Sequence, residues 1–98
     1  MSRRRYLVAY DIRDPRRLRT VHAAMKAFGY PLQYSVLVCD LDRREKLAMI
    51  ERLGAILDHS KDRVAIVDLG DAESRGVECF EFMGRSLPLP QANVVQIV

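Results

Sequence analysis

The residue of this sequence best placed to do chemistry is Asp11, which follows the apolar run Leu7–Ala9 at the end of an expected buried strand. Mg²⁺ prefers oxygen ligands such as carboxylates but takes about six of them, so one Asp cannot hold the ion alone. A twofold homodimer would supply two copies of Asp11. A Mg²⁺ or Mn²⁺ ion between them would relieve their repulsion and activate a water toward a phosphodiester. The alternative is that Asp11 only ends the strand or forms hydrogen bonds in the turn before Pro15.

Arginine is concentrated around this acid. Residues 1–19 contain seven Arg and two Asp, a local charge of +5, so the other 79 residues sum to −2 within the net charge of +3. Each guanidinium can bind two phosphate oxygens at once, which suits a nucleic-acid backbone. The alternative is a solvated basic terminus. The predicted nucleic-acid contacts are Arg13, Arg16, Arg17 and Arg19.

Other residue types that often carry catalysis have poor positions. His22 lies in the middle of an expected helix beside its apolar stripe, and His59 lies at the end of the next helix, where the helix dipole favours a cation. Ser35 lies within an expected strand and has no His or Lys at the spacing of a nucleophile motif. Cys39 and Cys79 do not belong to a C-x-x-C pair, so they do not indicate a zinc or redox site.

The elements that would position these residues are strands and amphipathic helices. One helix start is indicated by Asp14 and Pro15, and a second by the D-x-x-E pattern of Asp42 and Glu45. Residues 30–41 look too short for two strands, so the residues alone predict the order strand–helix–strand–helix–strand–strand. The predicted strands are Arg5–Ile12, Leu32–Leu41, Arg63–Leu69 and Val77–Met83. The predicted buried stripes are Leu18, Val21, Met25 and Phe28 in the first helix, and Leu47, Ile50, Leu53 and Leu57 in the second.

The chain is predicted to be one domain with a distinct C-terminal end. Its 98 residues suit one small core, which we place at residues 1–84, followed by a connector and a strand at 85–98. Asn93–Val98 has four apolar residues of six, so we expect it to pair with a sheet edge of its own or of a second subunit. No apolar run approaches the ~18 residues of a membrane span, and the expected location is the cytoplasm.

Three stretches together resemble the CRISPR-associated protein two family. They are YLVAYDIRD at Tyr6–Asp14, GYPLQYSVLVCDL at Gly29–Leu41 and RVAIVDLG at Arg63–Gly70. The resemblance implies an α+β fold of the ferredoxin-like type, a β-α-β-β-α-β sandwich whose C-terminal strand adds to the sheet of the partner subunit. It also implies that Asp11 is the metal-linked catalytic carboxylate of a homodimer and that Tyr10 belongs to the same catalytic site.

The same resemblance implies a magnesium-dependent endonuclease acting on single-stranded RNA or double-stranded DNA, with the CRISPR integrase as a partner during spacer acquisition. The main alternative is a non-catalytic scaffold that holds the duplex for the integrase. The sequence departs from many members at Leu37, where they have Phe, and at Pro31 and Leu32, where they have a nearby Arg. A toxin ribonuclease of the VapD type stays open. An RNA-recognition module is disfavoured because Arg63–Leu69 contains no aromatic residue for stacking.

Overall fold

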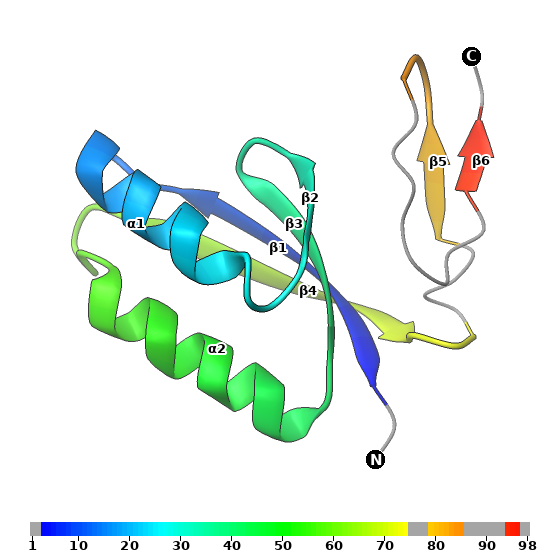
Figure 1. The fold of residues 1–98 in the computed structure, drawn as a ribbon, viewed down its shortest axis with the longest axis horizontal. Coiled ribbons are helices and arrows are strands. Elements are labelled where there is room, and N and C mark those ends of the chain that lie inside the picture. The colour runs from blue at the N-terminus through cyan, green and yellow to red at the C-terminus, as the bar shows by residue number, and fades with distance from the viewer. Residues whose placement is uncertain (1–2, 75–78, 86–93, 97–98) are drawn as a thin grey trace.

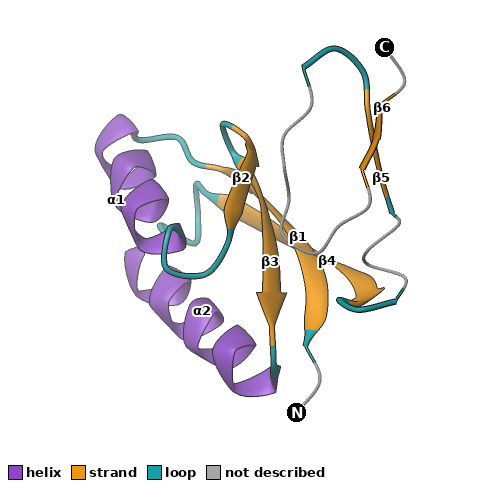
Figure 2. Cartoon of the chain, turned by 45° about the vertical axis from the view of Figure 1, so that its right-hand side comes forward, coloured by secondary structure: helices purple, strands orange, loops and turns teal. Residues whose placement is uncertain are grey.

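The protein is a sandwich of two helices on an antiparallel sheet (Figures 1 and 2). The computed structural model describes residues 3–74, 79–85 and 94–96. The elements are β1 (Arg4–Asp11), α1 (Pro15–Met25), β2 (Tyr30–Gln33), β3 (Val36–Leu41), α2 (Arg43–Ile56), β4 (Arg63–Asp71), β5 (Phe80–Phe82) and β6 (Val94–Gln96). The main sheet has the strand order β2-β3-β1-β4, and every neighbouring pair is antiparallel. The ferredoxin-like arrangement implied by the resemblance is confirmed.

The segment 30–41 contains two strands, so the prediction of a single strand from the residues alone was wrong. β2 and β3 form a hairpin whose turn consists of Tyr34 and Ser35. A two-residue turn joins antiparallel strands without further connecting residues, which is why so short a segment suffices for both. The carbonyl of Ser35 accepts a hydrogen bond from the backbone N–H of Tyr10 at 3.0 Å, which ties the turn to β1.

Both helices begin where the sequence predicts. The carboxylate of Asp14 caps α1 by accepting a hydrogen bond from the backbone N–H of Arg17 at 2.9 Å. Asp42 and Glu45 form the predicted capping box at the start of α2. The predicted stripe Leu18, Val21, Met25 and Phe28 lies in or against the main core, although α1 ends at Met25 and Phe28 belongs to the turn after it. Within the described residues, no helix is long and apolar enough to span a bilayer.

The buried face of α2 differs from the predicted one. Met49 and Leu53 are buried, whereas Leu47 is 59% exposed and Ile50 is 43% exposed. This helix carries apolar residues on two sides, so their spacing alone does not determine which side turns inward. Packing on the sheet and α1 selects the side of Met49. The prediction was therefore right for Leu53 and Leu57, which contact the core, and wrong for the other two.

The two faces of the main sheet are covered differently. Val8 and Tyr10 of β1 face the helices and belong to the main core. Leu7 faces the other side, where it packs against a second apolar cluster that contains Phe80 of β5. Because side chains alternate along a strand, Asp11 lies on the same side as Leu7, away from the helices. The predicted acid is therefore mounted on the face that carries no helix (Figure 2).

The C-terminal part forms a separate two-stranded sheet in which β5 and β6 are parallel. Of the predicted strand Val77–Met83, the structure contains β5 at Phe80–Phe82, and Val77 and Glu78 lie outside the described residues. Of the segment Asn93–Val98, Val94–Gln96 form strand β6, and the other three residues lie outside the described residues. The predicted connector lies outside the described residues from 86 to 93. Within this single chain β6 pairs with β5, so its addition to a partner's sheet stays a prediction.

Candidate nucleic-acid interface

Asp11 is the last residue of β1 and is exposed. In the β1–β4 ladder it lies opposite Arg63, so a cationic residue neighbours the carboxylate on the same face. In the ranges 3–74, 79–85 and 94–96, no group of three or more His, Cys, Asp or Glu side chains could hold a metal ion. Asp11 is thus a single exposed carboxylate, and its pairing with Asp11 of a second chain stays a prediction.

Tyr10 adjoins Asp11 in the sequence, but the two side chains lie on opposite faces of the sheet. Tyr10 is buried beneath α1, and its hydroxyl is 2.6 Å from Nδ1 of His22. Burial raises the pKa of Tyr10 to about 12, with smaller contributions from Tyr34 and Cys39. The phenol therefore stays protonated at neutral pH and bonds to a helix residue. The structure does not bring the two predicted catalytic residues together.

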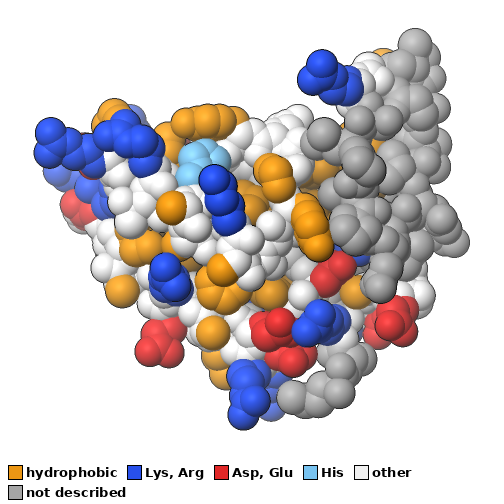
Figure 3. All heavy atoms as spheres, viewed as in Figure 1, with side chains coloured by type: hydrophobic (Ala, Val, Ile, Leu, Met, Phe, Trp, Pro, Cys, Tyr) orange, Lys and Arg blue, Asp and Glu red, His pale blue; other side chains and the backbone are white. Residues whose placement is uncertain are grey.

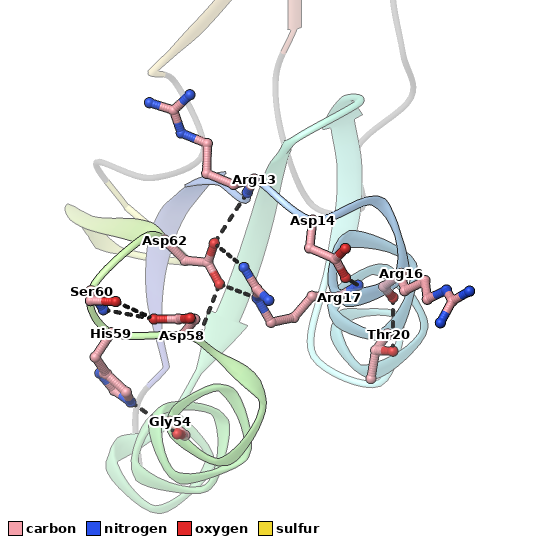
Figure 4. A network of polar contacts seen from close by, with 10 residues as sticks. All are labelled: Arg13, Asp14, Arg16, Arg17, Thr20, Gly54, Asp58, His59, Ser60 and Asp62. Carbon is pink, nitrogen blue, oxygen red and sulfur yellow. Dashed lines mark hydrogen bonds and ion pairs between the residues drawn. The ribbon is translucent and has the colours of Figure 1, made fainter.

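Arg17 is held by an acid of the same chain (Figure 4). Its Nε and Nη2 both donate to the carboxylate of Asp62, the second at 2.9 Å. The side chain of Asp62 is fully buried and also accepts hydrogen bonds from the backbone N–H groups of Arg13 at 3.1 Å and Asp58 at 2.9 Å. These bonds, that from Arg17 above all, hold the pKa of Asp62 well below its usual range. Arg17 therefore fastens the start of α1 to the loop before β4.

The other three predicted arginines, Arg13, Arg16 and Arg19, are exposed. None of their side chains forms an ion pair with another described residue. Figure 4 shows the side chains of Arg13 and Arg16 pointing away from the Asp62 network. Figure 3 shows Lys and Arg side chains gathered where α1 begins. These three exposed arginines have guanidinium donors available for phosphate oxygens.

Arg3, which precedes β1, and Arg4 and Arg5 at its start are paired with acids of the same chain. The pairs are Arg3 with Glu45 at 3.2 Å, Arg4 with Asp68 at 2.8 Å and Arg5 with Asp40 at 2.6 Å. Arg5 is only 1% exposed. The partners lie between 35 and 64 residues away along the chain, so no local spacing in the sequence indicates them. The local charge of residues 1–19 thus overstates the charge available to a ligand.

Comparison with known proteins identifies the family. The family described as "CRISPR associated protein Cas2" matches residues 4–76, which is most of the chain. The chain belongs to this family. The match includes the four strands of the main sheet and both helices, and the resemblance found in the sequence is confirmed.

Several members of the Cas2 family are close relatives in sequence. The chain is 46% identical over 68 residues to the CRISPR-associated endoribonuclease Cas2 1 of Rhodospirillum rubrum, an alignment that covers 69% of this chain and 67% of the relative. It is 45% identical over 69 residues to the CRISPR-associated endoribonuclease Cas2 of Geobacter sulfurreducens, covering 70% and 73%. It is 33% identical over 99 residues to the CRISPR-associated endonuclease Cas2 2 of Thermus thermophilus, covering 100% of both.

Solved structures agree with the family assignment. A hypothetical protein of Thermus thermophilus matches with a TM-score of 0.68 and 34% identity, covering 69% of this chain and 83% of that one. The Cas2 of Streptococcus pyogenes, crystallised at pH 6.5, matches with a TM-score of 0.64 and 31% identity, covering 67% and 86%. Fold and sequence therefore indicate the same family.

Proposed function

We propose that this chain is a CRISPR-associated endonuclease that acts as a homodimer on RNA or double-stranded DNA. Relatives aligned over two thirds or more of their length are named endoribonucleases or endonucleases. The observation that carries the proposal is the exposed carboxylate of Asp11 at the rigid end of β1, followed directly by the three exposed arginines. The chain thus offers an oxygen ligand for a divalent ion and, within the next eight residues, donors for a phosphate backbone.

The carboxylate of Asp11 has the oxygen donors that a divalent ion prefers, but one carboxylate is too few to hold the ion. Its exposed carboxylate offers the hard oxygen ligands of Mg²⁺ or Mn²⁺. Because one chain contributes a single carboxylate at the end of β1, we infer that Asp11 of a second copy completes the donor set. The ion would supply an activated water and charge stabilisation at the scissile phosphate.

Of the other predicted site residues, the exposed arginines would bind phosphates, whereas Tyr10 and Arg17 form contacts within the fold. Arg13, Arg16 and Arg19 would hold backbone phosphates. Tyr10 has a structural role in this proposal, because its hydroxyl joins β1 to His22 of α1 on the face opposite Asp11. Arg17 keeps the first turn of α1 in place through Asp62 and does not itself bind phosphate in this proposal.

A second candidate function is a scaffold that holds a DNA duplex for the CRISPR integrase without cutting it. It is favoured by the fact that the three exposed arginines need neither Asp11 nor a metal ion to bind phosphates. The two proposals share the dimer and the basic surface, and they differ only in the role of Asp11. The family match favours both over a toxin ribonuclease.

Asp11→Asn tests the nuclease against the scaffold. The change is nearly isosteric and removes the charge, so fold and duplex binding should persist while Mg²⁺- or Mn²⁺-dependent cleavage of RNA and DNA is lost. Glu51→Gln, at an exposed position of α2, is the matched control and should cut like the wild type. Cleavage at the wild-type rate by Asp11→Asn would refute its catalytic role. A wild type that binds the duplex but cuts no substrate with either ion would support the scaffold.

A further inference from the structure

A cluster of three rings lies on the helix side of the sheet, on the face opposite Asp11. His22 of α1 contacts Tyr10 of β1 on one side, with ring centroids 5.4 Å apart and planes at 78°. On the other side it contacts Tyr34 of the β2–β3 turn, with centroids 4.6 Å apart and planes at 77°. The hydroxyl of Tyr10 bonds to Nδ1 of His22, which holds the middle ring in place.

Tyr34 is the open end of this cluster. Its side chain is 70% exposed, although its ring is in edge contact with a half-buried imidazole. Nε2 of His22 is buried and has no hydrogen-bond partner among the described residues, so His22 contributes ring contact to Tyr34 rather than a polar link to it. A tyrosine held in one orientation loses little further rotamer freedom when a second ring stacks on it, which favours binding.

Basic residues lie on either side of His22, the residue whose ring contacts Tyr34. Arg19 lies three residues before His22, and Lys26, the C-terminal cap residue of α1, lies four residues after it. Helical spacing therefore places both on the side that carries His22, about 5–6 Å away between Cβ atoms. Both are exposed, and neither forms an ion pair with a described residue. Figure 3 shows hydrophobic, His and Lys or Arg side chains close together over α1 and the hairpin.

We propose that Tyr34 is a stacking platform for an unpaired base of a single-stranded nucleic acid, with Arg19 and Lys26 contacting the adjacent phosphates. Exposed aromatic rings beside a basic track bind single strands with little regard for sequence, because every base has a π face. Bases inside a duplex are already stacked and do not offer that face. The inference assumes that the chain binds nucleic acid, as in the proposed function, but it requires neither Asp11 nor a metal ion.

The test measures binding of a single-stranded RNA, a single-stranded DNA and a DNA duplex by fluorescence anisotropy in EDTA, where metal-dependent cleavage does not occur. Tyr34→Ala should weaken binding of both single strands by about 5- to 150-fold, the range for loss of one stacked base. Duplex binding should stay within about twofold of the wild type, because it needs no contact with this ring. Tyr34→Phe keeps the stacking surface and should bind like the wild type.

Tyr30→Ala is the matched control on the same hairpin. Tyr30 is 50% exposed, but it lies opposite Val38 in the ladder and so on the helix-free face of the sheet. Its loss should leave single-strand binding unchanged. Lys26→Gln should make the salt dependence of single-strand binding shallower by up to ~0.7 of a unit, whereas Tyr34→Ala should leave that slope unchanged.

A strand with abasic sites keeps the test independent of how well each variant folds. On that strand the wild type should lose the advantage that it has over Tyr34→Ala on normal strands. The inference would be overturned if Tyr34→Ala bound both single strands as tightly as the wild type does. It would also be overturned if the variant lost the same affinity for single strands and for the duplex. A wild type that binds duplex but not single strands would overturn it and leave the proposed function standing. A wild type that binds no nucleic acid would overturn both.

Discussion

Replacing the three exposed arginines should change how duplex binding depends on salt. Arg13, Arg16 and Arg19 carry guanidinium groups that no described acid engages. Each phosphate contact releases counterions and contributes about −0.9 to the slope of log affinity against log salt on B-form DNA. If all three contact phosphate, the triple Gln variant should have a slope shallower by about 2.7 per chain, and by up to about twice that value in a dimer.

Arg17→Gln is the comparison that makes this prediction specific to the structure. Its Nε and Nη2 are held by Asp62, so its loss should leave the salt slope unchanged. It should instead lower the melting temperature, because the buried carboxylate of Asp62 loses its main partner. The sequence alone predicts four equivalent phosphate-binding arginines. If that were so, Arg17→Gln would flatten the slope of log affinity against log salt as much as Arg16→Gln does.

The assay is an anisotropy titration of one labelled duplex at several NaCl concentrations in EDTA, repeated with a duplex of different sequence. Base preference should not change, because phosphate contacts carry no sequence information. A melting curve of each variant separates loss of contacts from loss of fold. The reasoning is refuted if the triple variant keeps the wild-type slope, or if Arg17→Gln flattens it as strongly as Arg16→Gln.

Other contacts predict changes in stability and activity. Because the pKa of Asp62 is lowered in the folded chain, its ionised carboxylate stabilises the fold at pH values above the ordinary aspartate pKa of about 4. This stabilisation declines as the pH falls further. Asp62→Asn should therefore reduce the pH dependence of acid unfolding in circular dichroism, and an unchanged dependence would contradict the pairing. Tyr10→Phe should lower the free energy of unfolding by about 0.5–1.5 kcal/mol, because it removes one hydrogen bond. The cleavage rate should stay the same because the hydroxyl faces away from Asp11, and a loss of cleavage would show that Tyr10 is catalytic. In urea denaturation, Leu53→Ala should cost about 2–5 kcal/mol and Leu47→Ala at most about 0.5 kcal/mol, and equal losses would contradict the orientation of α2.

Features that depend on a few consecutive residues could be predicted from the sequence. A helix cap depends on about three consecutive residues, so the residues around Asp14 and Asp42 indicate where the two helices begin. The position of Asp11 at the end of a strand follows in the same way from the apolar run before it. Propensity alone does not predict the hairpin at 30–41. The family resemblance implies the correct strand order because it compares whole stretches of chain.

Features that depend on contacts between distant segments required the folded chain. The orientation of α2, with Leu47 outward, results from packing, because apolar side chains on both sides of the helix make its periodicity ambiguous. The division of the arginines into engaged and exposed groups depends on partners such as Asp62, 45 residues from Arg17. Tyr34 meets His22 only because the hairpin folds back onto α1. Local sequence does not indicate these contacts, because the folded sheet and helices bring together residues that are far apart in the chain.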